Sequence, residues 1–155
     1  MSSQIGAGAS GSVITLAGEG ESAAFARMLA ADIKGGMIVG FSGTLGAGKT
    51  TLIRLLVGAI GGISPVSSPT YVLQHEYPTT AGVTIDHWDL YRLSELPEEL
   101  QGRCPANRVW LIEWPERIPE FLPVLDMRLT VGFPEVSAPA DYRLVSIEKR
   151  PVPEV

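Results

Sequence analysis

The sequence contains a single cysteine, no long apolar run and fewer basic than acidic residues. Cys104 alone supplies neither an internal disulfide nor a multi-thiolate metal site, which favours a reducing, cytoplasmic compartment. No apolar run approaches the roughly 18 residues that span a bilayer, and residues 1–11 lack the basic start of an export signal. We therefore expect a protein that neither enters a membrane nor is exported.

The charge balance limits the kind of partner. The chain has 12 Lys and Arg residues against 17 Asp and Glu residues, a net charge of −5, whereas general nucleic-acid binding needs a basic face. Apolar residues make up 45% and charged residues 19% of the chain, as is usual for a globular domain. The composition therefore excludes a disordered or fibrous chain and leaves room only for a local basic patch.

The sequence predicts one folded domain between two tails. Residues 1–11 are mostly Gly, Ser and Ala, which bury too little apolar surface to offset the entropy of ordering, so they are predicted to form a flexible tail. Residues 12–150 are long enough for one core, and residues 151–155 form a short C-terminal tail.

Apolar periodicity predicts strands and helices that alternate along most of the domain. Strands are predicted at 12–17, 37–42, 70–77, 83–91, 108–113, 126–133 and 141–149. Helices are predicted at 21–33, 50–60 and 94–101, with a further helical turn at 117–122. Apolar stripes mark the first two helices: Phe25, Met28, Leu29 and Ile33, then Leu52, Leu55, Leu56 and Ala59. This order favours a three-layer α/β fold with a mostly parallel central sheet and antiparallel C-terminal edge strands.

The sharpest motif is the glycine-rich segment 43–50, which matches G-x-x-x-x-G-K-[ST] between a predicted strand and a predicted helix. Its glycines allow successive N–H groups to turn towards a polyphosphate. Lys49 would reach the β- and γ-phosphates, Thr50 would place its hydroxyl on Mg²⁺, and Thr51 would contact the α-phosphate. The residues predicted to bind the nucleotide are Gly43, Leu45, Gly46, Ala47, Gly48, Lys49, Thr50 and Thr51. The motif therefore predicts a P-loop NTPase fold that binds a nucleoside triphosphate with Mg²⁺.

Acidic residues lie in two of the predicted strands. Glu113 ends an apolar run, which is where a carboxylate that helps to hold Mg²⁺ is expected. Asp86 and Asp89 lie in one extended segment, where alternation places them on opposite faces, so only one faces the phosphates. If Glu113 and one Asp converge, one holds the metal and the other orients an attacking water. The spacing does not divide these roles.

Two alternatives to an ATPase remain open at this point. The sequence has no N-K-x-D, D-x-x-G or L-S-G-G-Q-like segment, which removes the usual support for guanine specificity and for a transport ATPase. A small-molecule kinase would need an arginine-bearing lid, and Arg103, Arg108 and Arg117 form no recognisable lid. The other alternative is an interaction module that responds to ATP without needing hydrolysis.

The histidines and tryptophans give weaker signals. His75 and His87 lack a third soft ligand, so they are interpreted as ordinary polar residues and no zinc is predicted. Trp110 lies within a strand pattern and is expected in the core. Trp114 follows Glu113 in a tight Trp-Pro turn and is a candidate for shaping or gating the site.

Four blocks of sequence, taken in order, resemble one protein family. GTLGAGKTT, SPTYVLQHEYP, HWDLYRL and LIEWPER, spread from Gly43 to Arg117, are similar to the bacterial TsaE (YjeE) ATPases. The resemblance implies a small P-loop ATPase required for the N6-threonylcarbamoyl modification of adenosine 37 in tRNAs that read ANN codons. It also implies that ATP hydrolysis resets a partner complex of TsaD and TsaB, which carries the transfer, so tRNA is expected as an indirect partner through that complex.

The resemblance also implies which residues do the chemistry. Asp89 matches the essential Walker-B-like acid of the family, which selects it over Asp86, and Glu113 matches a metal-associated acid. The catalytic residues are therefore predicted to be Lys49, Asp89 and Glu113, and the metal would be held by Thr50 and Glu113.

Further parts of the chain take expected roles from the same resemblance. Ser68 and Thr70 match a switch-like segment near the γ-phosphate, and Trp114 matches the tryptophan beside the catalytic acid. In the family, adenine is contacted near a junction that corresponds to residues 17–22. The chain departs from the family by having Thr44 in place of the usual Asp and by a shorter segment 93–108, where a docking surface is expected.

Overall fold

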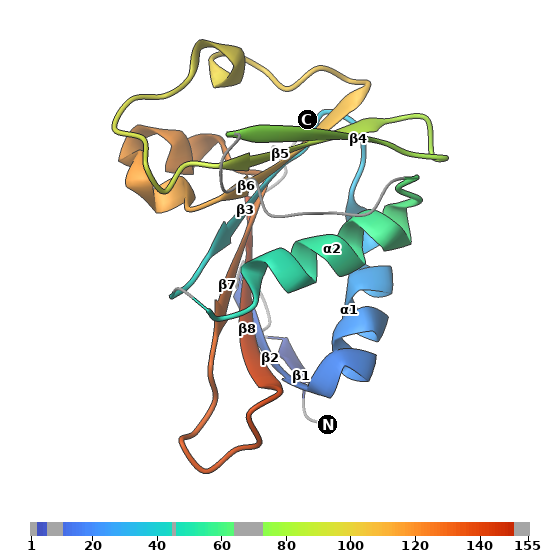
Figure 1. Ribbon diagram of the computed structural model, residues 1–155, viewed down its shortest axis with the longest axis vertical. Helices are drawn as coiled ribbons and strands as arrows, with labels where there is room; N and C mark the ends of the chain where they lie inside the picture. Colours follow the sequence, from blue (N-terminus) through green and yellow to red (C-terminus); the bar gives the residue numbers. More distant parts are fainter. Residues whose placement is uncertain (1–2, 6–10, 45, 64–72, 151–155) are drawn as a thin grey trace.

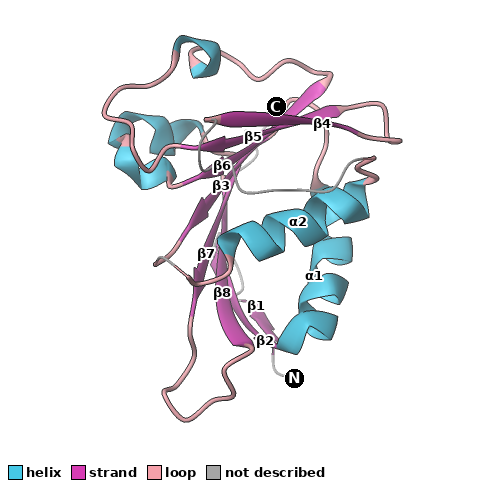
Figure 2. Ribbon diagram, viewed as in Figure 1, coloured by secondary structure: helices cyan, strands magenta, loops and turns pink. Residues whose placement is uncertain are grey.

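The computed structural model describes residues 3–5, 11–44, 46–63 and 73–150. The strands of this part are β1 (Ser3–Ile5), β2 (Gly11–Ala17), β3 (Ile38–Ser42), β4 (Gln74–Pro78), β5 (Thr84–Asp89), β6 (Arg108–Glu113), β7 (Met127–Gly132) and β8 (Tyr142–Lys149). They form one sheet in the order β1-β2-β8-β7-β3-β6-β5-β4. Two packed α-helices, α1 (Gly18–Asp32) and α2 (Lys49–Ile60), lie on one face, and short 3₁₀ segments lie on the other (Figures 1 and 2).

The sheet has a parallel centre and antiparallel flanks. Strands β7, β3, β6 and β5 are parallel to their neighbours within this group, whereas β1, β2, β8 and β4 pair antiparallel. The predicted α/β fold with parallel core strands and an antiparallel C-terminal hairpin is confirmed. Beyond that hairpin, β2 pairs with the outer side of β8, so this edge of the sheet comes from the start of the chain.

Part of the predicted N-terminal tail is a strand. Residues 3–5 form β1 and pair antiparallel with residues 12–14. The sequence of residues 3–5 offers little apolar surface, but backbone hydrogen bonds to an open sheet edge also order a segment. Residues 1–2, 6–10 and 151–155 lie outside the described residues, so the domain boundaries stay a prediction.

The two α-helices bury their predicted apolar sides against the sheet with small rotations. In α1, Phe25 and Leu29 are buried, but Met28 is 71% exposed. In α2, Leu52 and Leu56 are buried together with Ile53 and Val57, while Leu55 and Ala59 are not. Gly61 ends α2 in the left-handed region, where its N–H meets the carbonyls of residues 57 and 58. None of the helices in the described part of the chain is long and apolar enough to cross a membrane.

The second face of the sheet is covered by loops and 3₁₀ turns. Apolar residues of β5 and β6, such as Trp88 and Trp110, pack there against segments that contain η1 (Glu98–Leu100), η2 (Pro115–Arg117) and η3 (Pro119–Val124). The helix predicted at 94–101 is wrong, because only η1 forms there. Pro97 adopts an extended conformation with ψ of 144° inside the predicted helix and donates no backbone hydrogen bond.

The parallel centre of the sheet brings three strand ends together. The carboxyl ends of β3, β5 and β6 lie side by side, and the register pairs Asp89 with Glu113. The chain leaves β3 through the glycine-rich segment and enters α2 beside this edge (Figure 1). Ligand sites of parallel α/β sheets form at such an edge.

Candidate functional site

The glycine-rich segment has the backbone conformation that its sequence predicts. Gly48 precedes α2 with φ of +98°, and Gly43 has φ of +135°. A Cβ on Gly43 would lie 2.1 Å from the carbonyl oxygen of Val131 in β7. Glycine is therefore required at this position for two reasons, its backbone angle and the close approach of the neighbouring strand. Leu45 lies outside the described residues.

Lys49 begins α2 and is held against the loop. Its Nζ donates to the carbonyl oxygens of Gly43 at 2.6 Å and Thr44 at 3.0 Å, and lies 3.9 Å from the ring centroid of Trp114. Burial lowers the pKa of Lys49, an effect opposed by the negative charges of Glu113, Glu116 and Asp89. The structure thus places a desolvated ammonium among three carboxylates.

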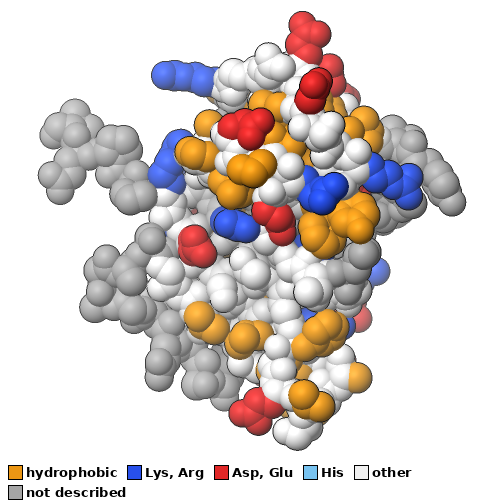
Figure 3. All heavy atoms as spheres, turned by 90° about the vertical axis from the view of Figure 1, so that its left-hand side faces the viewer, with side chains coloured by type: hydrophobic (Ala, Val, Ile, Leu, Met, Phe, Trp, Pro, Cys, Tyr) orange, Lys and Arg blue, Asp and Glu red, His pale blue; other side chains and the backbone are white. Residues whose placement is uncertain are grey.

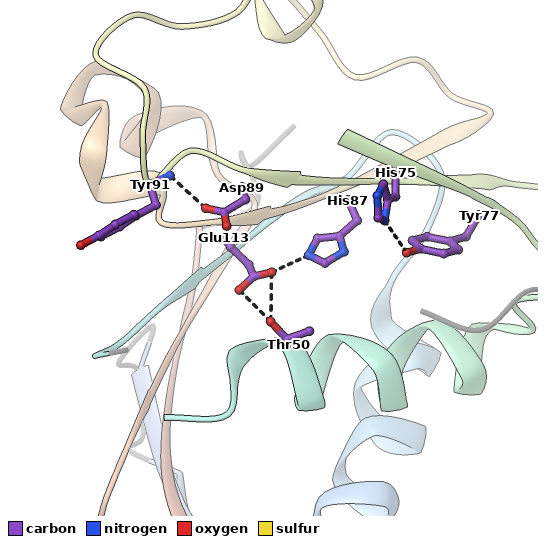
Figure 4. A network of polar contacts seen from close by, with 7 residues as sticks. All are labelled: Thr50, His75, Tyr77, His87, Asp89, Tyr91 and Glu113. Carbon is purple, nitrogen blue, oxygen red and sulfur yellow. Dashed lines mark hydrogen bonds and ion pairs between the residues drawn. The ribbon is translucent and has the colours of Figure 1, made fainter. Parts of the chain in front are cut away.

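Thr50 and Glu113 meet at the end of α2 that faces the sheet. The hydroxyl of Thr50 lies 3.2 Å from Oε1 and 3.4 Å from Oε2 of Glu113 (Figure 4). Glu113 is 4% exposed, at the carboxyl end of β6. A hydroxyl and a carboxylate side by side are the oxygen ligands that Mg²⁺ prefers, so this pair fits the predicted metal ion.

The two aspartates of β5 have different surroundings. Asp89 is the register partner of Glu113, and its Oδ1 accepts a hydrogen bond from the backbone N–H of Tyr91 at 2.9 Å. Burial raises the pKa of Asp89, and the nearby charge of Glu113 acts in the same direction. Asp86 instead accepts hydrogen bonds from Gln74 and Arg108, at 2.9 and 2.8 Å. The structure therefore brings Asp89, and not Asp86, next to Glu113.

Trp114 has a strained backbone beside the P-loop. Its φ of 60° is the sole positive value among the described non-glycine residues, a conformation that costs roughly 1–2 kcal/mol for an L-residue. The indole packs against Tyr91 with ring centroids 4.8 Å apart, while the guanidinium of Arg117 lies 5.5 Å from the Tyr91 ring. Trp114 therefore lies where it covers Lys49, as expected for a residue that shapes the site.

Sequence reasoning missed His87, which touches the predicted metal ligand. Its Nε2 lies 2.6 Å from Oε2 of Glu113, and the histidine is fully buried. The two-residue period of a strand was the available signal, because it places His87 on the same face of β5 as Asp89. The pairing with Glu113 was not visible, since it depends on the parallel register of β5 and β6.

Two arginines support the base of the P-loop and were also missed. Arg128 of β7 donates to the hydroxyl of Ser42 at 2.9 Å, and Ser42 donates to Glu116 at 3.0 Å. Arg143 of β8 donates through Nε to the carbonyl of Ala47 at 2.8 Å. No motif marks these residues, because their contacts join positions that are 86 and 96 residues apart in the chain.

A cavity of about 190 Å³ opens beside the start of α2. Its lining includes the N-terminal turn of α1, the first turn of α2 and β8, with Leu16, Glu19, Ser22, Thr51, Asp141 and Arg143. The segment 17–22, where the family resemblance expects the base, contributes to this wall.

The predicted switch residues Ser68 and Thr70 lie outside the described residues. In the ranges that the structure covers, no group of three or more His, Cys, Asp or Glu side chains forms a metal cluster.

Comparisons with known proteins give a consistent result. A family model described as threonylcarbamoyl adenosine biosynthesis protein TsaE matches residues 16–138. The tRNA threonylcarbamoyladenosine biosynthesis protein TsaE of Haemophilus influenzae is 41% identical over 102 residues, which are 63% of this chain and 63% of that protein. The protein of the same name from Aquifex aeolicus is 36% identical over 106 residues, 67% of this chain and 77% of that protein. The chain thus spans less than two thirds of the Haemophilus relative.

The fold has a counterpart among solved structures. A crystal structure of Bacillus subtilis YdiB matches with a TM-score of 0.67 and 26% sequence identity, over 90% of this chain and 85% of that chain. The likeness therefore extends well beyond the four sequence blocks to nearly the whole sheet and its helices.

Proposed function

The chain belongs to the TsaE family of threonylcarbamoyl adenosine biosynthesis, and from this premise we propose that it is the Mg-ATP-hydrolysing subunit of the tRNA N6-threonylcarbamoyladenosine modification system. The observation that carries the proposal is the contact of the P-loop residue Thr50 with Glu113, whose strand neighbour is Asp89. A P-loop used only for packing has no need of two buried or half-buried carboxylates in front of its lysine.

The P-loop residues bind and orient the triphosphate in this proposal. The backbone N–H groups of 46–50 and the positive end of α2 hold the phosphate oxygens. When ATP binds, the ammonium of Lys49 leaves the carbonyls of Gly43 and Thr44 and contacts the β- and γ-phosphates. Because burial has already removed water from the ammonium, this change costs little desolvation. Thr50 and Glu113 are the side chains that would hold Mg²⁺, which when bound would neutralise charge that develops on the phosphates.

Asp89 is the residue that positions the attacking water. Its carboxylate is half-buried next to Glu113, and its pKa is raised by burial, which makes it a better proton acceptor than an exposed aspartate. The contact of Glu113 with Thr50 supports the role proposed for Glu113 at the metal, which leaves the water to Asp89 in this proposal.

The base of the nucleotide is proposed to occupy the cavity beside α1. Gly48 and Thr51 of the P-loop line one side, so a nucleotide whose phosphates lie on the loop reaches it directly. Glu19 and Asp141 line this cavity and supply acceptors for a purine edge.

The activity of the isolated subunit is proposed to be weak and to be stimulated by TsaD and TsaB. Arg128 and Arg143 point into the loop's own backbone and Ser42, so neither is available as an arginine finger. On the face drawn in Figure 3, acidic and basic side chains of the described residues are interspersed with exposed apolar ones. This pattern suits a protein partner better than tRNA itself. We therefore propose that tRNA is engaged through the complex, and that the complex works in the cytoplasm.

The experiment that tests the proposal measures Mg²⁺-dependent phosphate release from ATP with and without purified TsaD and TsaB. Lys49→Ala and Glu113→Ala should each abolish the stimulated release, and Glu120→Ala, which removes an exposed glutamate, should not. Phosphate appearing on an organic acceptor would favour a kinase. Full tRNA modification by a Glu113→Gln variant that binds ATP without hydrolysing it would favour an interaction module. Absence of stimulation would contradict the assignment of partners.

A further inference from the structure

His87 forms a short, buried polar contact within the site, and the proposed chemistry does not use it. The side chain of His87 has no exposed surface, and its Nε2 lies 2.6 Å from Oε2 of Glu113. Figure 4 shows the imidazole pointing from β5 towards the carboxylate that also contacts Thr50. Because a carboxylate only accepts, Nε2 carries the proton in this hydrogen bond.

The other ring nitrogen argues against a purely structural role. Among the described residues, Nδ1 of His87 has no hydrogen-bond partner although it is buried. The ring lies next to the aromatic ring of Tyr77, with centroids 6.5 Å apart. An aliphatic or aromatic residue would fill this place without an unpaired polar atom, which costs roughly 1–3 kcal/mol. The cost of the unpaired Nδ1 is therefore offset by the hydrogen bond from Nε2 to Glu113.

The hydrogen bond at Nε2 fixes how Glu113 presents its oxygens. Oε2 is held by His87, while Oε1 makes the shorter contact with the hydroxyl of Thr50. A buried carboxylate with one anchored oxygen has little freedom to rotate, so its second oxygen stays aimed at Thr50. Ligands oriented by an outer hydrogen bond bind metal ions more tightly than unsupported ones.

We propose that His87 is a positioning residue that holds the Glu113 carboxylate in the orientation needed to bind Mg²⁺ together with Thr50. The inference rests on the proposed function, since it concerns the metal ion of the nucleotide site. It assigns to the histidine of the HWDLYRL block a role in metal affinity and none in contact with the nucleotide.

The test measures how Mg²⁺ changes the affinity for a fluorescent ATP analogue, which requires no hydrolysis. His87→Leu should weaken the apparent Mg²⁺ affinity by about 10- to 100-fold and leave the affinity for the analogue in EDTA unchanged. His87→Gln should retain most of the Mg²⁺ affinity, because its side-chain amide places an N–H donor near the position of Nε2. His75→Leu is the matched control, since His75 contacts Tyr77 and not Glu113.

A double-mutant comparison separates positioning from general damage. In a Glu113→Gln background, His87→Leu should cause no further loss of Mg²⁺ affinity, because there is no carboxylate left to orient. A wild-type Mg²⁺ response in His87→Leu, or an equal loss in both backgrounds, would overturn the inference.

A further measurement and the wild-type control cover the remaining outcomes. If His87→Leu does not fold, nitrogen-15 NMR of the wild-type histidine rings takes its place. Adding Mg²⁺ to the nucleotide complex should shift the ring signals of His87 and not those of His75, and unchanged His87 signals would overturn the inference. Failure of the wild type to bind the analogue would overturn the proposed function itself, whereas normal binding with an unaffected His87→Leu overturns the inference alone.

Discussion

The hydroxyl of Thr50 lies 3.2 Å from Oε1 of Glu113, although 63 positions separate the two residues in the chain. Thr50 lies in the first turn of α2, and Glu113 ends β6, the third strand after β3 along the chain. The contact exists because β3 and β6 are parallel neighbours and end at the same edge of the sheet. This contact links the phosphate-binding motif to the carboxylate that ends β6.

Replacing Thr50 by valine should weaken the effect of Mg²⁺ on nucleotide binding. Valine has the shape of threonine but no hydroxyl, so the metal ion would keep the carboxylate of Glu113 and lose the neighbouring hydroxyl oxygen as a ligand. We expect an apparent Mg²⁺ affinity at least about 10-fold lower, by analogy with the loss of other metal-supporting groups. Titration of Mg²⁺ by calorimetry would check this. Thr50→Ser, which keeps the hydroxyl, should behave as the wild type, and equal behaviour of both variants would contradict the prediction.

Tryptophan fluorescence should report nucleotide binding through Trp114. The ammonium of Lys49 lies 3.9 Å from the centre of this indole, and a phosphate that attracts Lys49 changes the field at the ring. Trp88 and Trp110 are each 4% exposed in the core on the other face of the sheet. We therefore expect an ATP-dependent change of emission that Trp114→Phe abolishes. A change that survives in Trp114→Phe and disappears in Trp110→Phe would refute this origin.

Two glycines of the P-loop should tolerate alanine to different degrees. A Cβ at Gly43 meets a backbone oxygen of β7 at 2.1 Å, whereas a Cβ at Gly46 meets nothing within 4 Å, although both glycines have positive φ. Gly46→Ala should cost about 1 kcal/mol of unfolding free energy for its backbone angle. Gly43→Ala should cost about 3–5 kcal/mol, since the strand must also move. Urea unfolding of the two variants measures the difference, and similar losses would contradict it.

Removing Arg108 should destabilise the protein in a pH-dependent way. Burial raises the pKa of Asp86, and Arg108 opposes this effect. A raised folded-state pKa means that the folded protein binds more protons than the unfolded one above pH of about 4, so stability falls as the pH rises through this window. In Arg108→Met the opposing charge is gone and the fall should be larger.

At pH 7 we expect Arg108→Met to lower the unfolding free energy by about 2 kcal/mol, because a buried carboxylate loses its partner. The deficit should shrink towards pH 4, where Asp86 takes up a proton. Urea unfolding at a series of pH values would show this. Adding Asp86→Asn to the variant should remove the additional pH dependence of the unfolding free energy that Arg108→Met causes. A deficit independent of pH would count against the explanation.

Cys104 should be inert in the folded protein. Burial raises the pKa of its thiol to about 11, and the Sγ–H faces the carbonyl of Arg108 at 3.4 Å. At pH 8 only about 0.1% of such a thiol is ionised, against a fifth or more in an unfolded chain. Reaction with a disulfide reagent should therefore be at least about 100-fold slower than in denaturant. A rapid reaction without denaturant would contradict this prediction.

The sequence predicted most strands, because a strand buried on both faces leaves a continuous apolar signature. β3 and β6 are of this kind, and both were found within one residue of their observed bounds. The order of the strands across the sheet was less accessible. Nothing in the sequence of β2 shows that it pairs with β8, since hydrogen bonds between strand backbones carry no side-chain code.

The site was predictable where its chemistry is local and not where it depends on the fold. Lys49 and Thr50 stand in a contiguous motif, and Glu113 ends an apolar run. His87 and Arg143 carry no such mark, because each becomes relevant only through a contact with a residue on another element. The predicted helix at 94–101 failed for a local reason, since Pro97 is extended and interrupts the segment despite the capping residues around it.

The position of β8 between β2 and β7 also sets the order in which the protein can assemble. On a ribosome, β2 emerges before β8, so the pairing of β2 with β8 forms only after residues 142–149 have been made. Until then the base of the P-loop also lacks the hydrogen bond from Arg143 to Ala47. A nascent chain therefore cannot complete its nucleotide site before the C-terminal hairpin is released, and such long-range closure folds slowly.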